Sequence, residues 1–298
     1  MDFRQLEAFI NVAKYKNFSK AGKALYLSQP TISLHIANLE KELSVSLFDR
    51  TSKEVNLTPV GKEFLTYALD MINTKNKALH HLVNAESAIQ GSIQISTSTT
   101  PSIVVLPAAL KAFRQRHPDV RFVIEEKSST LILEDVCSHT SDIGIVGMKV
   151  ENDRFHATHL YDDEIVFISA KNAPLKGVVD ILEASKYNMI GRTEKSGTRL
   201  DLERTMVEQG MDTSLLDNIL EVDNMNLIFK LVSENVGFSY TSKSIYNCYK
   251  DILPIQTFEI KGLKLIREIY LLTSKKRTQS PAVDDFVNLL KAMEMPNC

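Results

Sequence analysis

The feature that most constrains this chain is a run of about 30 residues that can form one uninterrupted helix. Thr58 and Pro59 suit the N-cap and first position of a helix, and neither proline nor glycine occurs between Gly61 and Gly91. A helix of that length spans about 45 Å, more than the diameter of a small domain. The chain is therefore expected to be multidomain, and its 298 residues agree with two or three folding units.

The predicted helix carries an unusually broad apolar face. Two heptad-spaced stripes run along it: Phe64, Ala68, Met71, Lys75, Ala78, Leu82, Ala85 and Ile89, and beside them Leu65, Leu69, Ile72, Asn76, Leu79 and Val83. The small unit before the helix is too short to cover such a face, so a helix from a second chain is the economical partner. Asn76 would then fix the register of the pair. Packing within the same chain is the alternative.

The residues before this helix predict a compact helical unit. Residues 3–43 are typical of three helices, with Ser19 and Ser28 as N-cap candidates and Pro30 in the first turn of the third. The third helix buries a stripe formed by Ile32, Ile36, Leu39 and Leu43. Its other side is polar near the N-terminus, the end that a helix-turn-helix presents to DNA bases. The DNA-binding candidates there are Ser28, Gln29, Pro30, Thr31, Ser33 and His35. A solvated helix face without a ligand is the alternative.

A two-stranded wing is expected next, because Leu47–Arg50 and Val55–Leu57 flank a polar loop at 51–54. Arg50 and Lys53 would contact phosphates, which bind cations regardless of sequence. The net charge of −2 argues against a surface that coats nucleic acid everywhere. Residues 1–60 nevertheless hold 8 basic and 6 acidic side chains, against 27 and 31 in the remainder, so the positive excess lies at the N-terminus.

From Gly91 onward, short strands alternate with helices. Strands are predicted at 93–95, 120–125, 143–146, 165–169, 188–190, 238–241 and 268–273, and helices at 104–116, 198–209, 224–234 and 282–293. This order is typical of an α/β unit with a largely parallel sheet. The ligand crevices of such units lie at the carboxyl ends of the strands.

Two hydroxyl-rich junctions between a strand and a helix predict an anion site. One is formed by Ser98, Thr99 and Thr100, and the other by Ser196, Gly197 and Thr198. Hydroxyls and free backbone N–H groups at a helix start bind anions without a metal. Gly147 completes the ligand-binding candidates. For the first junction, simple N-capping is the alternative.

Six fragments in order resemble the winged helix-turn-helix of LysR-type transcriptional regulators. They are Phe3-Arg4-Gln5-Leu6-Glu7-Ala8-Phe9, Phe18-Ser19-Lys20-Ala21-Gly22-Lys23-Ala24-Leu25, Leu27-Ser28-Gln29-Pro30-Thr31-Ile32-Ser33, Leu39-Glu40-Lys41-Glu42-Leu43, Leu47-Phe48-Asp49-Arg50 and Leu57-Thr58-Pro59-Val60-Gly61. Ser141-Asp142-Ile143-Gly144-Ile145 and Glu234-Asn235-Val236-Gly237-Phe238 resemble the effector-binding domain of the same family. Residues 192–199 resemble a stretch of the members related to sulfur assimilation and carbon fixation.

The resemblance implies an α+β multidomain chain. The expected parts are a DNA-binding domain at 1–58 with its helix-turn-helix at 18–37, a linker and dimerisation helix at 59–90, and an effector domain at 91–298. That domain would resemble periplasmic binding proteins, with subdomain I at 91–160 and 266–298, subdomain II at 161–265, and crossing strands near Leu160 and Leu265. Gly22, Leu34 and Ser44 depart from the family, which usually has alanine, arginine and glycine at these positions.

Other classes of protein fit less well. The chain has no nucleophile elbow, P-loop, zinc-protease or dinucleotide motif, and no histidine spacing of a metal site, so neither an enzyme nor a cofactor is expected. No apolar run is long enough to cross a membrane and no export signal is present, so a cytoplasmic protein is expected. A cytoplasmic solute-binding protein is an alternative, and the absent export signal and the N-terminal helix-turn-helix argue against it. A thiol redox sensor that joins Cys137 to Cys248 is a further alternative, and Cys298 completes the three cysteines.

The sequence thus predicts a sequence-specific, DNA-binding transcriptional regulator whose activity depends on a small molecule. The expected effector is a small anion or carboxylate held between the two C-terminal subdomains. The other expected partners are double-stranded DNA, a second copy in a homodimer, further copies in a homotetramer, and RNA polymerase.

Overall fold

The computed structural model describes residues 1–49, 55–82, 89–194, 196–216 and 218–294. The N-terminal unit contains three helices and a short hairpin: α1 (Phe3–Tyr15), α2 (Phe18–Leu25), α3 (Gln29–Leu43), β1 (Phe48–Asp49) and β2 (Asn56–Leu57). The core includes Phe9 and Phe48, whose rings lie 5.4 Å apart, together with the predicted stripe residues Ile32, Ile36 and Leu39. Ser28 caps α3 as predicted, whereas the expected cap Ser19 is wrong, because Asn17 accepts a hydrogen bond from the backbone N–H of Lys20.

Helix α4 (Pro59–Leu82) follows, with Thr58 at its start accepting from the Gly61 N–H at 2.9 Å. Its first half packs on the core of its own N-terminal unit through Phe64, Leu65, Ala68, Met71 and Ile72. For this half of the helix the structure supports packing within the same chain, and contact of the face with a second chain stays a prediction. Tyr67 and Leu79 remain exposed on α4.

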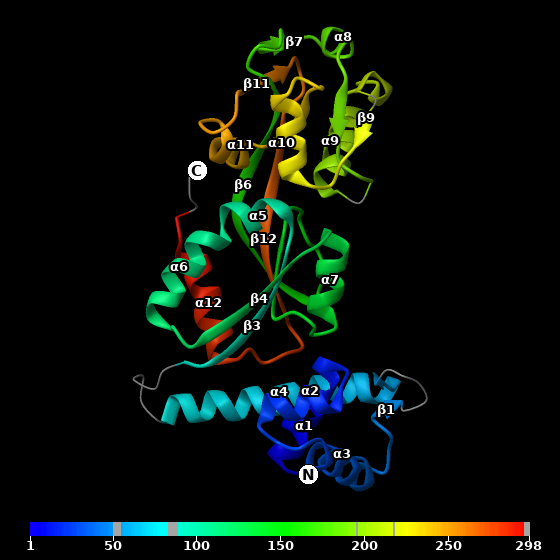
Figure 1. Ribbon diagram of the computed structural model, residues 1–298, viewed down its shortest axis with the longest axis vertical. Helices are drawn as coiled ribbons and strands as arrows, with labels where there is room; N and C mark the ends of the chain where they lie inside the picture. Colours follow the sequence, from blue (N-terminus) through cyan, green and yellow to red (C-terminus); the bar gives the residue numbers. More distant parts are fainter. Residues whose placement is uncertain (50–54, 83–88, 195, 217, 295–298) are drawn as a thin grey trace.

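Helix α4 also lies against the C-terminal half (Figure 1). The Asp70 carboxylate accepts a hydrogen bond from the Thr278 N–H at 2.6 Å, and the buried Asn73 amide donates to the Thr278 carbonyl at 2.5 Å. Lys77 pairs with Asp284 at 2.6 Å. These contacts join α4 to the C-terminal half of the molecule.

The lower subdomain in Figure 1 is built on three parallel strands: β3 (Gly91–Thr97), β4 (Val120–Glu126) and β5 (Ile143–Val146). Four helices accompany them: α5 (Thr99–Val104), α6 (Leu106–Arg116), α7 (Ser129–Cys137) and α12 (Pro281–Ala292). The C-terminal helix α12 returns to this subdomain, where Phe286 packs edge-on against Phe113 at 5.1 Å.

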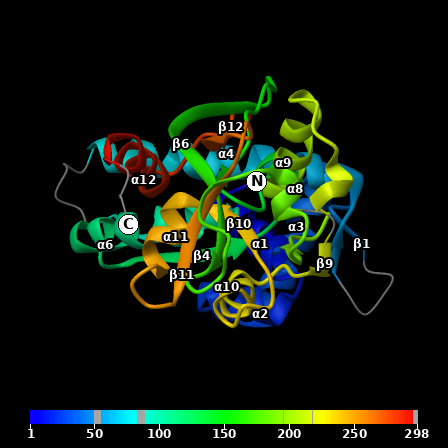
Figure 2. The same cartoon turned by 90° about the horizontal axis from the view of Figure 1, so that it is seen from above.

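The upper subdomain contains the segments between residues 171 and 264. Its strands are β7 (Gly177–Val179), β8 (Met189–Gly191), β9 (Asn218–Glu221), β10 (Ser239–Ser242) and β11 (Ile255–Ile260). Its helices are α8 (Ile181–Ala184), α9 (Gly197–Glu208), η1 (Thr213–Leu216), α10 (Met225–Ser233) and α11 (Lys243–Tyr249). Seen from above, these elements lie over the lower subdomain (Figure 2).

Two long strands run through both subdomains: β6 (Phe155–Ala170) and β12 (Leu265–Ser274). They pair antiparallel from Leu265 opposite Ile165 to Ser274 opposite Phe155. The main sheet has the order β4-β3-β5-β12-β6-β11-β7, with β10 also paired to β6. It is mixed, so the expectation of a largely parallel sheet is wrong, because β12 pairs antiparallel with both β5 and β6. None of the described helices combines the length and apolarity needed to span a membrane.

Ser44 offers a test of how α3 ends. It adopts a left-handed conformation with φ 55°, although it stands where the related family usually has glycine. Such a conformation costs an L-residue about 1–2 kcal/mol, so Ser44→Gly should stabilise the N-terminal unit by about 1 kcal/mol. The measurement is hydrogen–deuterium exchange of the full chain, which should show slower exchange in α3.

Gly22→Ala is the opposing control, because its new Cβ would lie 2.7 Å from the Leu27 carbonyl oxygen and force the helix-turn-helix to shift. Exchange in α3 that is unchanged or faster in Ser44→Gly would contradict the assignment of strain to Ser44.

Candidate functional site

Helix α3, which carries the predicted DNA-binding side chains, lies at the end of the molecule farthest from the upper subdomain (Figure 1). Ser28, Gln29 and Pro30 are exposed, and Thr31, Ser33 and His35 are partly exposed. The Gln29 amide donates to the Ser33 hydroxyl at 3.0 Å, and Ser28 and Thr31 share a hydrogen bond of 2.8 Å. The short polar side chains therefore form one solvent-facing surface on the first two turns, free of the buried Ile32–Ile36 stripe.

Besides the polar side chains of α3, Leu34 and Tyr26 bear on this surface. Arg50 and Lys53, the predicted phosphate contacts, lie outside the described residues. Leu34 is 60% exposed, so the departure from the family's arginine puts an apolar side chain in solvent beside the polar face. Tyr26, which the sequence analysis did not select, is 96% exposed in the turn before α3. The position of an aromatic residue in the turn of a helix-turn-helix is the sequence signal that indicates such an exposed side chain.

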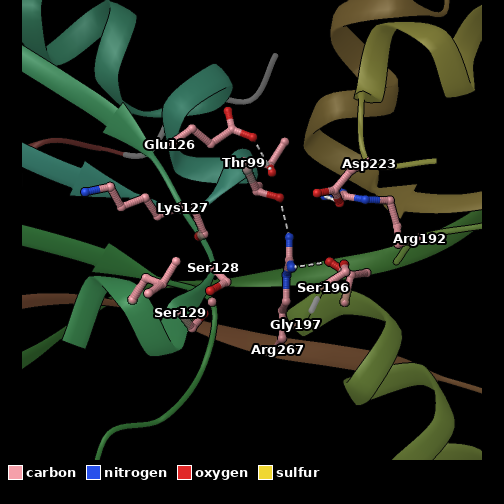
Figure 3. Close-up of a pocket in the computed structure, with 15 residues that line it drawn as sticks. Thr99, Glu126, Lys127, Ser128, Ser129, Arg192, Ser196, Gly197, Asp223 and Arg267 are labelled. Atoms are coloured by element: carbon pink, nitrogen blue, oxygen red, sulfur yellow. Dashed lines mark hydrogen bonds and ion pairs between the residues drawn. The ribbon is translucent and has the colours of Figure 1, made fainter. Parts of the chain in front are cut away.

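The seven predicted ligand-binding residues line one cavity between the two subdomains. Ser98, Thr99, Thr100 and Gly147 reach it from the lower subdomain, and Ser196, Gly197 and Thr198 from the upper one (Figure 3). The cavity volume is about 240 Å³, which suits a small molecule or ion with its water. The fold therefore brings together two junctions that are about 100 residues apart along the chain.

Arg267 connects the two sides of this cavity. It lies on β12 with a side chain only 8% exposed, and its Nε and Nη2 donate to Asp163 Oδ2 on β6 at 2.9 and 2.7 Å. Its Nη1 donates to the Thr198 hydroxyl at 2.7 Å, and its Nη2 also donates to the Thr100 hydroxyl. Figure 3 shows the guanidinium reaching toward both subdomains.

The Asp163 carboxylate holds that arginine in place. Asp163 is fully buried, and its second oxygen accepts a hydrogen bond from the Ser242 hydroxyl at 2.5 Å. An ion pair excluded from water in this way persists only when its remaining hydrogen bonds are satisfied. Ser242 and the two threonines satisfy them here, so the guanidinium is a preorganised cation at the base of the cavity.

A second buried cation, Arg192, lines the cavity from the upper subdomain. Arg192 is only 8% exposed, and its Nε has no hydrogen-bond partner among the described residues. Its Nη2 contacts Asp223 at 3.2 Å, and the Thr193 hydroxyl donates to the same Asp223 oxygen. Because an unpaired buried donor is costly, Arg192 is suited to a ligand acceptor.

The helix starts around the cavity are not capped by their own serines. Ser98, Ser128 and Ser196 occupy the N-cap positions of α5, α7 and α9, and none accepts a capping hydrogen bond through its side chain. The Ser98 hydroxyl is buried without a partner. The alternative of simple N-capping at the first junction is therefore wrong. Uncapped hydroxyls and N–H groups at helix starts are groups that bind anions.

The lining also contains anions, which limits the charge that the cavity can accept. Glu126 accepts hydrogen bonds from Thr99 and Ser102 at 2.7 and 3.0 Å, and Asp223 faces Arg192.

Lys127 pairs with Asp135 and Glu125, and these hydrogen bonds raise the pKa of its ammonium group. Burial raises the pKa of Tyr240, whose hydroxyl accepts from the Arg192 N–H, to about 12, so it stays protonated at neutral pH.

Several residues of this site escaped sequence reasoning. Arg267 and Asp163 are the main ones, and Ser128, Ser129 and Glu126 also line the cavity. Arg267 lies at an inward position of the alternating segment 265–269, where a buried apolar residue is expected. That single break in the pattern was the available signal, whereas its partner Asp163 lies 104 residues away.

The two described cysteines lie in different subdomains. Cys137 ends α7 and packs near Val136 and Phe155, whereas Cys248 lies on α11 and donates to the Ser244 carbonyl. No disulfide joins Cys137 to Cys248 in the structure, and Cys298 lies outside the described residues. A bond between Cys137 and Cys248 would require the subdomains to rearrange.

Comparison with known families gives two matches. Residues 3–62 match the bacterial regulatory helix-turn-helix protein, lysR family, and residues 86–294 match the LysR substrate binding domain. Among curated relatives, the uncharacterized HTH-type transcriptional regulator MJ0300 of Methanocaldococcus jannaschii is 30% identical over 94% of this chain and 95% of its own. A probable RuBisCO transcriptional regulator of Phaeodactylum tricornutum is 25% identical over 98% of this chain and 96% of its own.

Solved structures of low sequence identity share the fold. A full-length OxyR variant from Pseudomonas aeruginosa has a TM-score of 0.77 at 17% identity, covering 99% of this chain and 96% of its own. Full-length CbnR in complex with its target DNA has a TM-score of 0.58 at 19% identity, covering 98% and 99%. The effector-binding domain of QuiR in complex with shikimate has a TM-score of 0.58 at 22% identity, covering 68% and 96%.

The buried ion pair yields a stability prediction. Asp163→Leu should destabilise the full chain by about 3–5 kcal/mol, because it leaves the Arg267 guanidinium buried without its counter-ion. The double variant Asp163→Leu/Arg267→Met should recover much of this loss, since no buried charge remains unpaired. The measurement is chemical denaturation followed by far-ultraviolet circular dichroism.

Glu164→Gln is the matched control on the neighbouring residue. Glu164 pairs with Lys243 at the surface, where the two side chains are 39% and 55% exposed, so its loss should cost no more than about 1 kcal/mol. Equal effects of Asp163→Leu and Glu164→Gln would show that the Arg267–Asp163 pair does not organise the domain.

Proposed function

The chain belongs to the LysR family of bacterial DNA-binding transcriptional regulators, and we propose that its effector is a small oxyanion or carboxylate bound between the two subdomains. The observation that carries this proposal is the pair of buried arginines, Arg267 and Arg192, facing one small cavity. Guanidinium groups bind carboxylates and oxyanions through paired N–H donors, more strongly than neutral groups do.

The cavity supports an effector of limited size and charge. Its volume of about 240 Å³ favours an ion or small acid. Glu126 and Asp223 lie at the lining, so a second strongly charged anionic group would meet repulsion there. Hydroxyl donors on the effector would find acceptors in these same carboxylates. A single anionic group, with or without hydroxyls, is therefore the preferred chemistry.

Two branches of the family supply candidate effectors. The stretch 192–199 resembles members related to sulfur assimilation and to carbon fixation, and the first of these branches favours sulfate and its relatives. The relatives named as RuBisCO regulators, from Phaeodactylum tricornutum and Allochromatium vinosum, are both 25% identical to this chain and favour a metabolite of carbon fixation instead. Because these relatives match nearly the whole chain, a metabolite of carbon fixation is the better supported effector.

Arg267 also suggests how effector binding reaches the DNA-binding unit. An anion that draws the guanidinium away from Thr100 and Thr198 would shift β12, on which Arg267 lies. That strand ends at Ser274, four residues before Thr278, whose backbone is held by Asp70 and Asn73 of α4. A displacement of β12 would thus move the helix that carries the winged unit. The effector can shift the equilibrium between the displaced and undisplaced arrangements of β12 only by the difference in its affinity for the two.

The site residues for DNA follow from the same family assignment. Ser28, Gln29, Pro30, Thr31, Ser33 and His35 would face base edges, and Arg50 and Lys53 phosphates. Tyr67 and Leu79 leave apolar surface on α4 for a second copy, which supports a homodimer. A homotetramer through the effector domains, RNA polymerase as a partner and a cytoplasmic location complete the proposal.

The alternatives gain no support from the geometry. A redox switch would need Cys137 and Cys248 to meet from different subdomains. A solute-binding protein would have no use for the polar, exposed face of α3. A regulator gated by an anion uses both the polar face of α3 and the cavity between the subdomains.

Effector binding can be tested with a panel of anions. Isothermal titration calorimetry of the full chain with sulfate, thiosulfate, sulfite, phosphate monoesters and small carboxylates should identify a ligand. Arg192→Gln should then weaken that ligand by about tenfold to a hundredfold, because a hydrogen bond to a charged group is lost.

Arg204→Gln is the control for this experiment, since Arg204 lies on the same helix α9 as the cavity residue Thr198 but is 68% exposed and absent from the cavity lining. It should leave the affinity unchanged. Failure of every anion to bind the wild type, or an equal loss in both variants, would place the effector elsewhere.

DNA binding can be separated into base reading and phosphate contact. Gln29→Ala should cost about 1–3 kcal/mol on an operator selected from random DNA and little on unrelated duplexes. Lys53→Ala should weaken both, and should reduce the slope of affinity against salt by about one unit. Fluorescence anisotropy at several salt concentrations measures both quantities. Equal losses for both variants on both DNAs would contradict these roles.

A further inference from the structure

The crossing strands present a second set of side chains on the face opposite Arg267. In the register of β6 and β12, Asp163 lies opposite Arg267 and the preceding Asp162 lies opposite Glu268. Because successive residues of a strand point to opposite faces, Asp162 and Glu268 turn away from the effector cavity. The two pairs therefore lie on opposite faces of the same segment of β6 and β12. We call this segment the hinge, because the two strands run through both subdomains.

A β-bulge adds a histidine to this outer face. The register shifts between Ile269 and Tyr270, so that Ile269 lies opposite Tyr161 and Tyr270 opposite His159, while Leu160 has no partner. An unpaired residue of this kind re-aims the side chains that follow it. As a result His159, three residues from Asp162, lies on the same face, and its Nε2 is 2.8 Å from Asp162 Oδ1.

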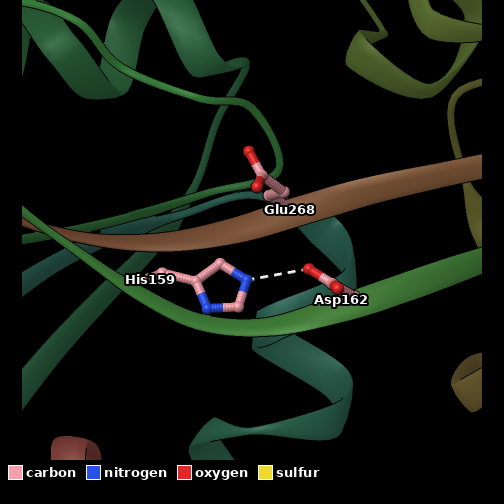
Figure 4. Close-up of side chains that lie close together, drawn as sticks. All are labelled: His159, Asp162 and Glu268. Carbon is pink, nitrogen blue, oxygen red and sulfur yellow. Dashed lines mark hydrogen bonds and ion pairs between the residues drawn. The ribbon is translucent and has the colours of Figure 1, made fainter.

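The outer face places two carboxylates directly opposite each other, Asp162 and Glu268. Like charges at such positions repel and destabilise a sheet unless a cation lies between them. Ligand atoms of His159, Asp162 and Glu268 all lie within 4.8 Å of one another (Figure 4). The Tyr270 hydroxyl donates to Glu268 Oε2 at 3.2 Å and orients that carboxylate.

We propose that His159, Asp162 and Glu268 bind a divalent transition-metal ion of the zinc class. One imidazole nitrogen and two carboxylate oxygens are ligands that such ions accept at about 2.0–2.2 Å, with water completing the coordination. Ligand atoms in a tetrahedral zinc site lie about 3.4 Å apart, so small rotations of these surface side chains would suffice. The imidazole argues against magnesium or calcium, which take oxygen ligands.

The surroundings leave the three ligands accessible. The side chains of His159 and Asp162 are 44% and 62% exposed. Lys149, the nearby cation, is 60% exposed and pairs with Glu151 at 2.7 Å, so it does not occupy the position between the carboxylates. The ring of Tyr270 packs edge-on against His159 at 5.5 Å and limits the orientations of the imidazole.

The bound ion would act on the hinge. It ties β6 to β12 at the register where the opposite face holds Asp163 and Arg267, and so resists sliding of the two strands. This regulatory consequence rests on the proposed effector function, whereas binding of the metal itself does not.

The test uses untagged full-length protein and Zn²⁺ or Co²⁺ as the probe. Equilibrium dialysis should find one ion per chain that depends on His159, and Co²⁺ should give the visible absorption of a site with a nitrogen ligand. His159→Gln and Glu268→Gln should each lower the affinity for the metal more than about tenfold. Substitution of a residue that only hydrogen-bonds to a metal ligand already lowers the affinity by about tenfold or more.

His156→Gln is the matched control, because His156 lies exposed on the same strand outside the cluster. It should leave the metal affinity unchanged, and far-ultraviolet circular dichroism should be identical in all variants. The proposal is overturned if the wild type binds no stoichiometric ion, or if His156→Gln lowers the affinity as much as His159→Gln. Anion titrations of the same variants report separately on the effector cavity.

Discussion

The buried pair between Arg267 and Asp163 is the interaction on which the effector half depends. It joins the two crossing strands at the level where the subdomains meet, and the guanidinium extends from it to Thr100 on one side and Thr198 on the other. Desolvating two charges is costly, and in an effector domain a cation held ready for an anion is a function that can justify the cost. In the proposed function the same arginine serves packing, closure and recognition.

The linker helix has a similar double role. Its first half completes the core of the winged unit through Phe64 and Met71, while Asp70, Asn73 and Lys77 hold the loop after β12 and the start of α12. A helix used on two sides cannot move independently of either unit. In the proposed function a displacement of β12 would reach α3 through these contacts, without a separate mechanical element.

Alternation along β6 and β12 gives the hinge two chemically different faces. Asp163 and Arg267 point into the cavity, whereas the adjacent Asp162 and Glu268 point outward and meet His159 because Leu160 forms a bulge. A one-residue change in register would exchange these faces. The bulge is therefore as important to the outer cluster as the identity of its ligands.

The sequence by itself determined the features that depend on local pattern. The Ser28 cap, the stripe of Ile32, Ile36 and Leu39, the strand 143–146 and the family assignment all follow from residues close together in the chain. The hydroxyl junctions at 98–100 and 196–198 were also visible, because each is a short run between a strand and a helix. Only the tertiary structure decided that these junctions share a cavity, that Arg267 and Asp163, 104 residues apart, lie at its base, and that the sheet is mixed. The physical reason is that helical and strand periods encode which face of an element is buried, whereas the pairing of distant strands depends on register and on the packing of the whole chain.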